Sequence, residues 1–392
     1  MNKLRIAIVC DGVNKFVAGS SNSSIHFSEL LSKRGHKVII ISSGSSKTLE
    51  INTHKRIKIY CLPGFPVPKS NKTLYFAYPN SKIVMDILKE ERINIVHFML
   101  PTPLSFSAIS AANKLHLRII GHSHTQPENW IAQVPWVFDV IKKVIVSWGY
   151  KFLIRVYSKA DAIICPSEFC EKLLKSNGLK KKTYVISNGV NTSVFKIQDS
   201  KRYAKDYSLS AETKKILFVG RLEPEKNVSL LIKSLKYVKR RFKNFEVCIV
   251  GVGSLKEHLI KLAKELYVEQ KVRFIGCVPI KELVRIYNFC DIFVLPSFVE
   301  LEGMVVLEAM ACAKPILVAD SPDSASPFLI RNNGFLFNPK SPEDLACKTI
   351  KLLKNNRLRM TFSKESYKRS KEFDINCSVL KLEKAYFDII NS

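Results

Sequence analysis

A regular alternation of short apolar runs with longer segments of helical periodicity is the feature that most constrains the fold. Runs of four to six mostly apolar residues, separated by helical segments, are typical of βαβ units and parallel sheets. The runs form two series, at residues 5–10, 37–41, 57–61, 95–99, 118–122, 162–165 and 183–186, and then at 215–220, 247–251, 272–276, 292–295, 315–319 and 334–337. The sequence therefore predicts an α/β protein with two doubly wound halves.

The two series meet near Asn188-Gly189, a dipeptide typical of turns. A polar, basic stretch follows at residues 198–214. We therefore expect an N-terminal domain over residues 1–195, a linker over 196–214 and a C-terminal domain over 215–376. Apolar residues at helical spacing predict a last helix over 377–392 with a buried face, which we expect to pack on the N-terminal domain.

The chain is strongly basic, with 62 Lys and Arg against 34 Asp and Glu, a formal net charge of +28. Residues 1–205 hold 31 basic and 12 acidic residues, so most of the excess lies in the first half. A positive face attracts nucleic acid, anionic lipid or anionic small molecules. The alternative is a lysine-rich surface that is merely solvated.

The ten cysteines show no CxxC pair and no metal-ligand spacing, and several lie in apolar runs. This pattern predicts buried free thiols in a reducing compartment. The first apolar run is short and is followed at once by Asp11, which favours a buried strand over a signal peptide. No stretch approaches the ~20 apolar residues of a membrane span. We expect a cytoplasmic protein.

The segment Gly-Arg-Leu-Glu-Pro-Glu-Lys-Asn at 220–227 follows a predicted strand and precedes a helix. It places Arg221 and Lys226 beside the free N–H groups of a helix N-terminus. Two cations at such a position are typical of a diphosphate site. An ordinary basic loop is the alternative.

The segment Glu-Leu-Glu-Gly-Met-Val-Val-Leu-Glu at 300–308 also follows a strand. We expect Glu300 in the loop and Glu308 near the start of a helix, with Gly303 allowing a ligand to approach the backbone. Glu308 lies among apolar residues, so its carboxylate needs a partner such as a sugar or ribose hydroxyl. Acidic residues that merely favour a helix N-terminus are the alternative.

Three further segments attract attention. His122 and His124 lie at a strand end, where they suit polyol recognition or acid–base work, although a structural histidine is the commoner outcome. The loop 11–22 has small residues leading into a helix but no GxGxxG pattern. Residues 136–157 mix aromatic and aliphatic residues with lysines, which fits either a pair of membrane-surface helices or core packing.

Together these segments resemble the retaining GT-B glycosyltransferases of family GT4 over nearly the whole chain. The shared order is a glycine-containing N-terminal loop, a strand-end histidine, an Asn-Gly hinge, Gly-Arg-Leu-x-x-Glu-Lys and Glu-x7-Glu. The resemblance implies two Rossmann-like domains facing a central cleft, with the C-terminal helix docking back. It also implies an acceptor-binding N-terminal domain and a C-terminal domain that binds a nucleoside diphosphate sugar, with neither a metal nor a cofactor.

The resemblance assigns roles to individual residues. Arg221 and Lys226 neutralise the leaving diphosphate, Glu300 faces the donor sugar and His124 lies near that sugar, so these four form the expected catalytic set. Glu308 holds the ribose. The other expected binding residues are Gly19, Ser20, Gly276, Val278, Gly303, Met304 and Val305. The sequence departs from the family pattern at Ser20 and Ala313, where glycine is usual, and at Asn191, where aspartate is usual.

Within the family, residues 126–129 and 301–305 look similar to diacylglycerol glucosyltransferases. This likeness implies transfer of glucose, with UDP-glucose favoured, to a membrane lipid by a protein peripheral on the inner face of the plasma membrane. The anionic membrane surface would then be a partner and nucleic acid would not. The alternatives are a soluble or polyprenyl-linked saccharide acceptor, an epimerase-like relative without transfer, and a basic nucleic-acid-binding protein.

Overall fold

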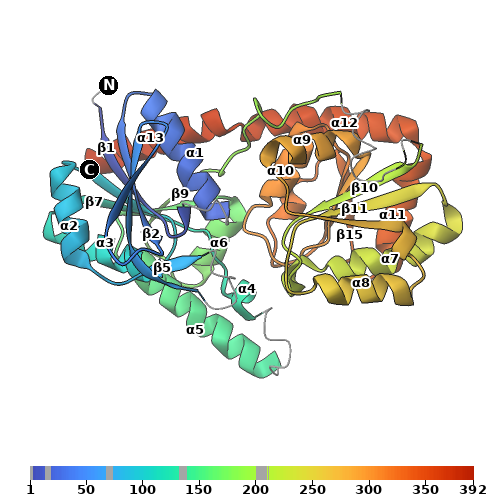
Figure 1. Ribbon diagram of the computed structural model, residues 1–392, viewed down its shortest axis with the longest axis horizontal. Helices are drawn as coiled ribbons and strands as arrows, with labels where there is room; N and C mark the ends of the chain where they lie inside the picture. The colour runs from blue at the N-terminus through green and yellow to red at the C-terminus, as the bar shows by residue number, and fades with distance from the viewer. Residues whose placement is uncertain (1–2, 14–18, 68–73, 132–138, 200–209, 211) are drawn as a thin grey trace. The chain divides into compact units, whose positions relative to one another are not determined.

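The structure is a computed structural model that describes residues 3–13, 19–67, 74–131, 139–199, 210 and 212–392. The chain divides into two compact units (Figure 1). Unit 1 comprises Met1–Pro127, Asp139–Asn188 and Asn376–Ser392, and unit 2 comprises Glu128–Phe138 and Gly189–Ile375.

Unit 1 is built on one sheet of nine strands. The strands are β1 (Arg5–Val9), β2 (Lys37–Gly44), β3 (Glu50–His54), β4 (Ile57–Pro66), β5 (Tyr75–Ala77), β6 (Ile95–Phe98), β7 (Arg118–His122), β8 (Ala162–Cys165) and β9 (Lys182–Val185). Their order is β3-β4-β2-β1-β6-β7-β8-β9, with β5 paired to β4. Only β3 and β5 pair in antiparallel fashion. The central strands are apolar because helices cover both faces of the sheet.

The helices of unit 1 are α1 (Gly19–Lys33), α2 (Ser81–Glu90), α3 (Pro103–Lys114), α5 (Asp139–Tyr157), α6 (Glu168–Ser176) and α13 (Ile375–Ile390). Successive side chains of a strand point to opposite faces. His97 of β6 accordingly meets Tyr386 of α13, with 2.7 Å between Nδ1 and the hydroxyl. Its neighbour Phe98 stacks on Tyr157 of α5 with 6.2 Å between ring centroids. The helices α13 and α5 therefore cover opposite faces.

The last helix, α13, is fixed to unit 1 by buried polar contacts as well as apolar ones. Glu383 accepts hydrogen bonds from Arg34, at 2.6 Å, and contacts His36 Nε2 at 2.7 Å. Glu383 is itself buried, and the pKa of its carboxyl is lowered by these two partners although burial alone would raise it. Charge-assisted hydrogen bonds of this kind hold a carboxylate in a defined position.

Unit 2 contains a fully parallel sheet of six strands. They are β10 (Lys214–Val219), β11 (Phe245–Val250), β12 (Val272–Gly276), β13 (Ile292–Leu295), β14 (Ile316–Ala319) and β15 (Gly334–Phe337). The order is β12-β11-β10-β13-β14-β15. The short helix α4 (Pro127–Ile131) lies at the boundary between the chain segments of the two units.

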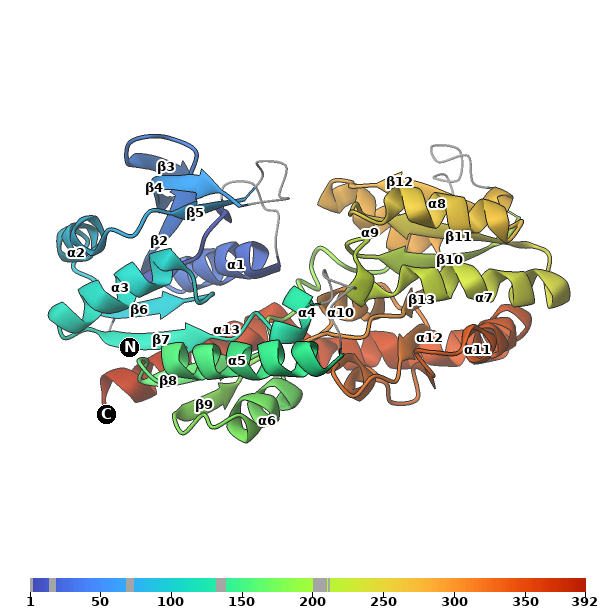
Figure 2. The same cartoon turned by 90° about the horizontal axis from the view of Figure 1, so that it is seen from below.

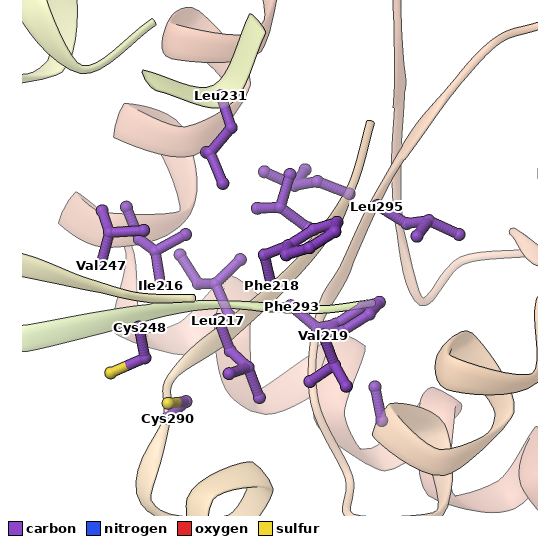
Figure 3. Close-up of a cluster of buried hydrophobic side chains, with 14 of the residues drawn as sticks. Ile216, Leu217, Phe218, Val219, Leu231, Val247, Cys248, Cys290, Phe293 and Leu295 are labelled. Carbon is purple, nitrogen blue, oxygen red and sulfur yellow. The ribbon is translucent and has the colours of Figure 1, made fainter. Parts of the chain in front are cut away.

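The helices of unit 2 lie on both faces of its sheet. They are α7 (Val228–Arg241), α8 (Lys256–Glu265), α9 (Ile280–Phe289), α10 (Met304–Ala311), α11 (Pro342–Lys354) and α12 (Asn356–Ser370), with 3-10 turns η3 (Pro224–Lys226), η4 (Glu269–Lys271), η5 (Ser326–Leu329) and η6 (Lys371–Phe373). Figure 1 shows α7 and α8 below the sheet and α9 and α10 above it. Figure 3 shows the core between these layers: Leu231 of α7 approaches Ile216 and Val247, while Cys248 and Cys290 lie on the other side of the strands.

These sheets confirm the predicted α/β class with two doubly wound halves. The cysteines in or beside the predicted apolar runs, Cys10, Cys61, Cys165, Cys248 and Cys290, are buried and free, as expected, whereas Cys277, Cys347 and Cys377 are exposed. The strands β3 and β5 were missed by the sequence analysis. In β3 every residue is at least partly exposed, so its sequence Glu-Ile-Asn-Thr-His has no apolar run to reveal it. In the part of the chain that the structure describes, no helix has both the length and the apolarity to cross a bilayer.

Candidate functional site

The candidate site of unit 2 lies at the carboxyl edge of its sheet, where ligands bind in open α/β sheets. Because β10 and β13 are neighbours, the loops that follow them leave the sheet side by side. The first loop carries Arg221 and Lys226 and the second carries Glu300. The backbone joins the two loops directly, since Phe298 N donates to Glu225 O at 2.8 Å.

Close backbone contact between strand ends makes glycine necessary at this edge. Gly220 N donates to Val250 O at 3.0 Å, and Gly251 has a φ of +135°. A Cβ added to Gly251 would lie 1.9 Å from Gly220 O, and one added to Gly253 would lie 2.4 Å from Leu222 O. The tight packing holds the start of the Arg221 loop in one conformation.

Lys226 and Glu300 form an ion pair, with 2.6 Å between Nζ and Oε1. Both side chains are mostly buried, at 16% and 14% exposure. Lys226 ends η3, and the next residue, Asn227, has a left-handed φ of 50° that starts α7. The family resemblance implies separate roles for these two side chains, Lys226 at the diphosphate and Glu300 at the sugar. The structure brings them together.

Arg221 is more exposed than Lys226 and is held by a different carboxylate. Its Nη2 donates to Glu225 Oε1 at 2.6 Å. Glu225 is fully buried, and within the described residues its Oε2 has no hydrogen-bond partner. The buried carboxylate therefore orients Arg221, and the Arg221 side chain, which is 56% exposed, remains available to an anion.

The start of α10 offers backbone donors. Gly303 precedes the helix with a φ of 91°, and an added Cβ would lie 2.4 Å from Ser326 Oγ. Glycine has no side chain to cap the first N–H groups, which belong to Met304 and Val305. A helix N-terminus with free N–H groups binds anions. Ser326 Oγ beside it is buried without a hydrogen-bond partner among the described residues.

Glu308 lies in the middle of α10, one turn later than predicted. The hydroxyl of Tyr287 donates to its Oε2 at 2.8 Å and contacts Val305 O at 3.2 Å. Burial raises the pKa of Glu308 to about 7, and the hydrogen bond from Tyr287 opposes that rise. The structure therefore supplies the partner that the sequence analysis required for this carboxylate, and a second oxygen remains for a ligand.

Gly276 ends β12 and Val278 follows it, two strands from β10 along the same edge. Gly276 has a φ of +83°, and an added Cβ would meet no atom within 4 Å. Its carbonyl accepts from Gly251 N at 2.8 Å. Val278 packs against the core of unit 2. Their predicted contact with a nucleobase stays a prediction.

Of the candidate residues of unit 1, His124 belongs to a column of stacked histidines. His124 follows β7 and stacks on His122 at 4.2 Å between centroids, and His122 stacks on His97 at 5.4 Å. Burial lowers the pKa of His97 and of His124 to about 3 and that of His122 well below its ordinary value. All three imidazoles are therefore neutral at pH 7.

Gly19 and Ser20 begin α1, which also contributes Phe27 to this column. Phe27 stacks on His122 with 6.0 Å between centroids. Gly19 is exposed and Ser20 is buried. Residues 14–18 of the predicted small-residue loop lie outside the described part of the chain.

The segment 136–157 was left open between membrane contact and core packing. Residues 136–138 lie outside the described part, and the remainder forms α5. Leu153, Val156 and Tyr157 are buried, whereas Val140, Trp148 and four other apolar side chains are exposed. The end of the helix therefore packs on the sheet, and its first half does not.

Three residues of the site escaped the sequence analysis: Tyr287, Glu225 and Ser326. Tyr287 lies on α9 and was hidden in an ordinary helical pattern. Glu225 was counted only as part of the 220–227 motif, and Ser326 lies in a stretch without an apolar pattern. Their roles depend on contacts between segments that are distant in the sequence, except for Glu225, which is four residues from Arg221.

Comparison with known proteins links the chain to carbohydrate transfer. The family model described as Glycosyl transferases group 1 matches residues 199–369, and that of Glycosyltransferase Family 4 matches residues 17–194. The chain is similar to the alpha-monoglucosyldiacylglycerol synthase of Streptococcus pneumoniae, with 24% identity over 325 residues that cover 81% of this chain and 72% of the relative.

Two solved structures share the fold over nearly the full length. Sucrose-phosphate synthase from Thermosynechococcus elongatus matches with a TM-score of 0.81 at 17% identity, covering 99% of this chain and 100% of that chain. An Anabaena protein solved in complex with UDP and glucose matches with a TM-score of 0.76 at 16% identity, covering 98% and 100%.

Proposed function

Since the chain belongs to the group 1 glycosyltransferases of family 4, and is an enzyme of that class, we propose that it transfers a hexose from a nucleoside diphosphate sugar to a membrane lipid. The favoured donor is UDP-glucose and the favoured acceptor is diacylglycerol. Family membership replaces the alternative of a nucleic-acid-binding protein. The observation that carries the proposal is the buried Lys226–Glu300 pair on the same loops as Arg221 and the start of α10.

The geometry of unit 2 supports a nucleoside diphosphate as the donor. Arg221, Lys226 and the N–H groups of Met304 and Val305 supply positive charge and hydrogen-bond donors for two phosphates. Glu308 supplies a carboxylate oxygen for ribose hydroxyls. The similar fold of a protein solved with UDP and glucose supports this choice.

In the proposed reaction, the acceptor hydroxyl oxygen forms a bond to the anomeric carbon of the sugar. The bond between that carbon and the phosphate oxygen breaks, and its electron pair leaves with the nucleoside diphosphate. The hydroxyl proton passes to the departing phosphate. Negative charge grows on the phosphate, so fixed cations and N–H groups stabilise the transition state more than the ground state. Glu300 would position both Lys226 and the sugar hydroxyls.

We propose that the anomeric configuration is retained and that no metal ion takes part. The similarity to a synthase named for an alpha-linked glucolipid supports retention. Lys226 and Arg221 would neutralise the diphosphate in place of a divalent cation. Treatment with EDTA should leave the transfer rate unchanged, and a rate that falls and then recovers with Mg²⁺ would contradict this part.

A product assay tests the function. The purified chain is incubated with UDP-glucose and vesicles that contain diacylglycerol, and the lipid product is identified by mass spectrometry and by the NMR coupling of its anomeric proton. We expect an alpha-glucosyl lipid. Transfer only to a soluble or polyprenyl-linked saccharide would replace the acceptor, and a modified donor without transfer would favour an epimerase-like enzyme.

The similarity to a glucolipid synthase also supports a peripheral position on the inner face of the plasma membrane. The expected lipid acceptor lies in the bilayer, and the excess of basic residues in the first half of the chain suits an anionic surface. Cell fractionation in low and high salt tests this location.

A further inference from the structure

The helix α5 carries a concentration of exposed apolar side chains over its first 14 residues. Eighteen large hydrophobic side chains are exposed among the described residues, and six of them lie within 13 consecutive positions of this one helix. They are Val140, Ile141, Val144, Ile145, Trp148 and Phe152. Val140 and Trp148 are 74% and 69% exposed. Contiguous apolar surface of this kind marks an interaction site.

Helical geometry gathers these side chains on one side. Ile141, Ile145, Trp148 and Phe152 follow the spacing of i, i+4, i+7 and i+11, which is a single stripe of an α-helix. Val140 and Val144 form the adjacent row. We call these six residues the α5 face. In Figure 1, α5 is a long straight helix along the lower boundary of unit 1, and Figure 2, seen from below, shows the same helix in front of that unit.

The end of the helix anchors this face to a rigid base. Tyr157 stacks on Phe98 of β6, and the ring of Phe152 meets Phe106 of α3 edge to face at 6.0 Å. Leu153 and Val156 are buried in the same turns. The helix is therefore held by its last two turns, and the turns that carry Val140 to Trp148 project their apolar side chains outward.

The charged residues along the α5 face and in the turns that follow it, between Asp139 and Asp161 in the sequence, are cationic. Residues 140–160 contain five cations, Lys142, Lys143, Lys151, Arg155 and Lys159, and no Asp or Glu. Four of them, Lys143, Lys151, Arg155 and Lys159, are exposed. An apolar helix face bordered by cations is complementary to an anionic bilayer, in which the apolar groups enter the interface and the cations meet lipid phosphates.

We propose that the α5 face docks unit 1 on an anionic lipid bilayer, with α5 lying in the plane of the interface. The proposal rests on the proposed function, since it names the surface by which the enzyme meets a bilayer that holds its acceptor. The occupant is the lipid surface itself. Dimer formation through this face, in place of vesicle binding, would instead assign it to a second copy of the chain.

The three tryptophans of the chain make the contact directly measurable. They are Trp130, Trp136 and Trp148, so replacing the first two by Phe leaves Trp148 as the sole indole reporter. Vesicles of phosphatidylcholine alone are compared with vesicles that also contain phosphatidylglycerol. We expect a blue shift of Trp148 emission, and quenching by brominated acyl chains, only with the anionic vesicles. An unchanged emission spectrum with bound protein would overturn the proposal.

Sedimentation with the same vesicles tests the contribution of the face in the otherwise unchanged chain. We expect Trp148→Glu and Ile145→Glu to weaken binding at least tenfold, because a charge enters the apolar stripe, and Lys151→Glu to weaken it most at low salt. The matched control is Tyr267→Glu, which changes an aromatic residue of unit 2 that is 79% exposed. Equal binding of all variants would overturn the proposal.

The remaining outcomes separate docking from catalysis. Vesicles without diacylglycerol and samples without donor measure docking alone, so docking can be found even if no lipid is glycosylated. Glycosylation of a short-chain acceptor in detergent, together with no vesicle binding at low salt, would remove the α5 proposal and keep the proposed function. A dimer that Trp148→Glu converts to a monomer, without vesicle binding, would assign the face to a second copy.

Discussion

The ammonium group of Lys226 lies 2.6 Å from a carboxylate oxygen of Glu300, although 74 residues separate them in the chain. The contact fixes two loops at the carboxyl edge of one sheet. Both side chains are largely buried, so solvent screens this ion pair only weakly. The site is therefore a coupled unit, and single substitutions should disturb both roles.

Lys226→Ala and Glu300→Ala should each reduce kcat by on the order of 10²–10³-fold, because charge on the leaving phosphate loses its fixed partner or that partner loses its position. Removal of one partner leaves the other unpaired and should cost about 1–3 kcal/mol of folding free energy.

Turnover and thermal unfolding are measured together for both variants. The control is Lys175→Ala, which breaks the 2.8 Å pair with Glu171 on unit 1; near-normal turnover in the site variants would refute the roles.

Donor binding should depend on the ionisation of Glu308. Its pKa of about 7 lies above the ordinary value of 4.5, so the carboxylate forms as the pH rises through 7. If the carboxylate accepts ribose hydroxyls, the KM for donor should fall between pH 6 and pH 8, and Glu308→Gln should flatten this dependence. Tyr287→Phe removes a hydrogen bond that lowers this pKa and should move the midpoint to higher pH.

The raised pKa of Glu308 also predicts how the stability of the fold changes with pH. The folded state binds the Glu308 proton more tightly than the unfolded state, so this group stabilises the fold below about pH 4.5 and the contribution is lost as the pH rises through 7. Glu308→Gln should therefore raise the melting temperature at pH 8 and have little effect at pH 5. A lower melting temperature at pH 8 would contradict the shifted pKa.

His124 should act as a neutral imidazole. Its pKa of about 3 predicts no titration between pH 5 and pH 9. His124→Asn should lower kcat on the order of tenfold or more without changing the shape of the pH–rate profile, since the lost group did not titrate in that range. An NMR titration of histidines labelled with ¹³C checks the charge state directly, and a His124 midpoint near pH 6.5 would show the prediction to be wrong.

Substitution of Gly251 and of Gly276 by alanine separates the cost of a steric clash from the cost of a positive φ. Both have positive φ, but a Cβ at Gly251 would lie 1.9 Å from Gly220 O, whereas one at Gly276 would meet no atom within 4 Å. Gly276→Ala should cost about 1–2 kcal/mol from its dihedral alone. Gly251→Ala should cost several times more and lower activity, because the Arg221 loop must shift. Chemical denaturation of both variants measures the difference, and equal costs would contradict the clash.

The strands could be predicted from the sequence where they are buried, because a buried strand consists of apolar residues. Each predicted apolar run became a strand, and the central strands are apolar because both faces of their sheets are covered. The exposed strand β3 left no such pattern. The site residues at strand ends could be chosen for the same reason, since loops after parallel strands share one edge. The contacts among them, such as Tyr287 with Glu308, depend on strand order and helix rotation, which periodicity does not encode.

The path of α13 has a consequence for how the protein is made. Tyr386 and Glu383 complete the packing of His97, Arg34 and His36 in unit 1, yet they are translated only after the whole of residues 189–375. During synthesis, the surface of unit 1 that α13 covers in the folded protein therefore stays exposed while unit 2 is translated. Until α13 has been translated, nascent unit 1 should expose this surface to chaperones, so its folding depends on synthesis of the second unit.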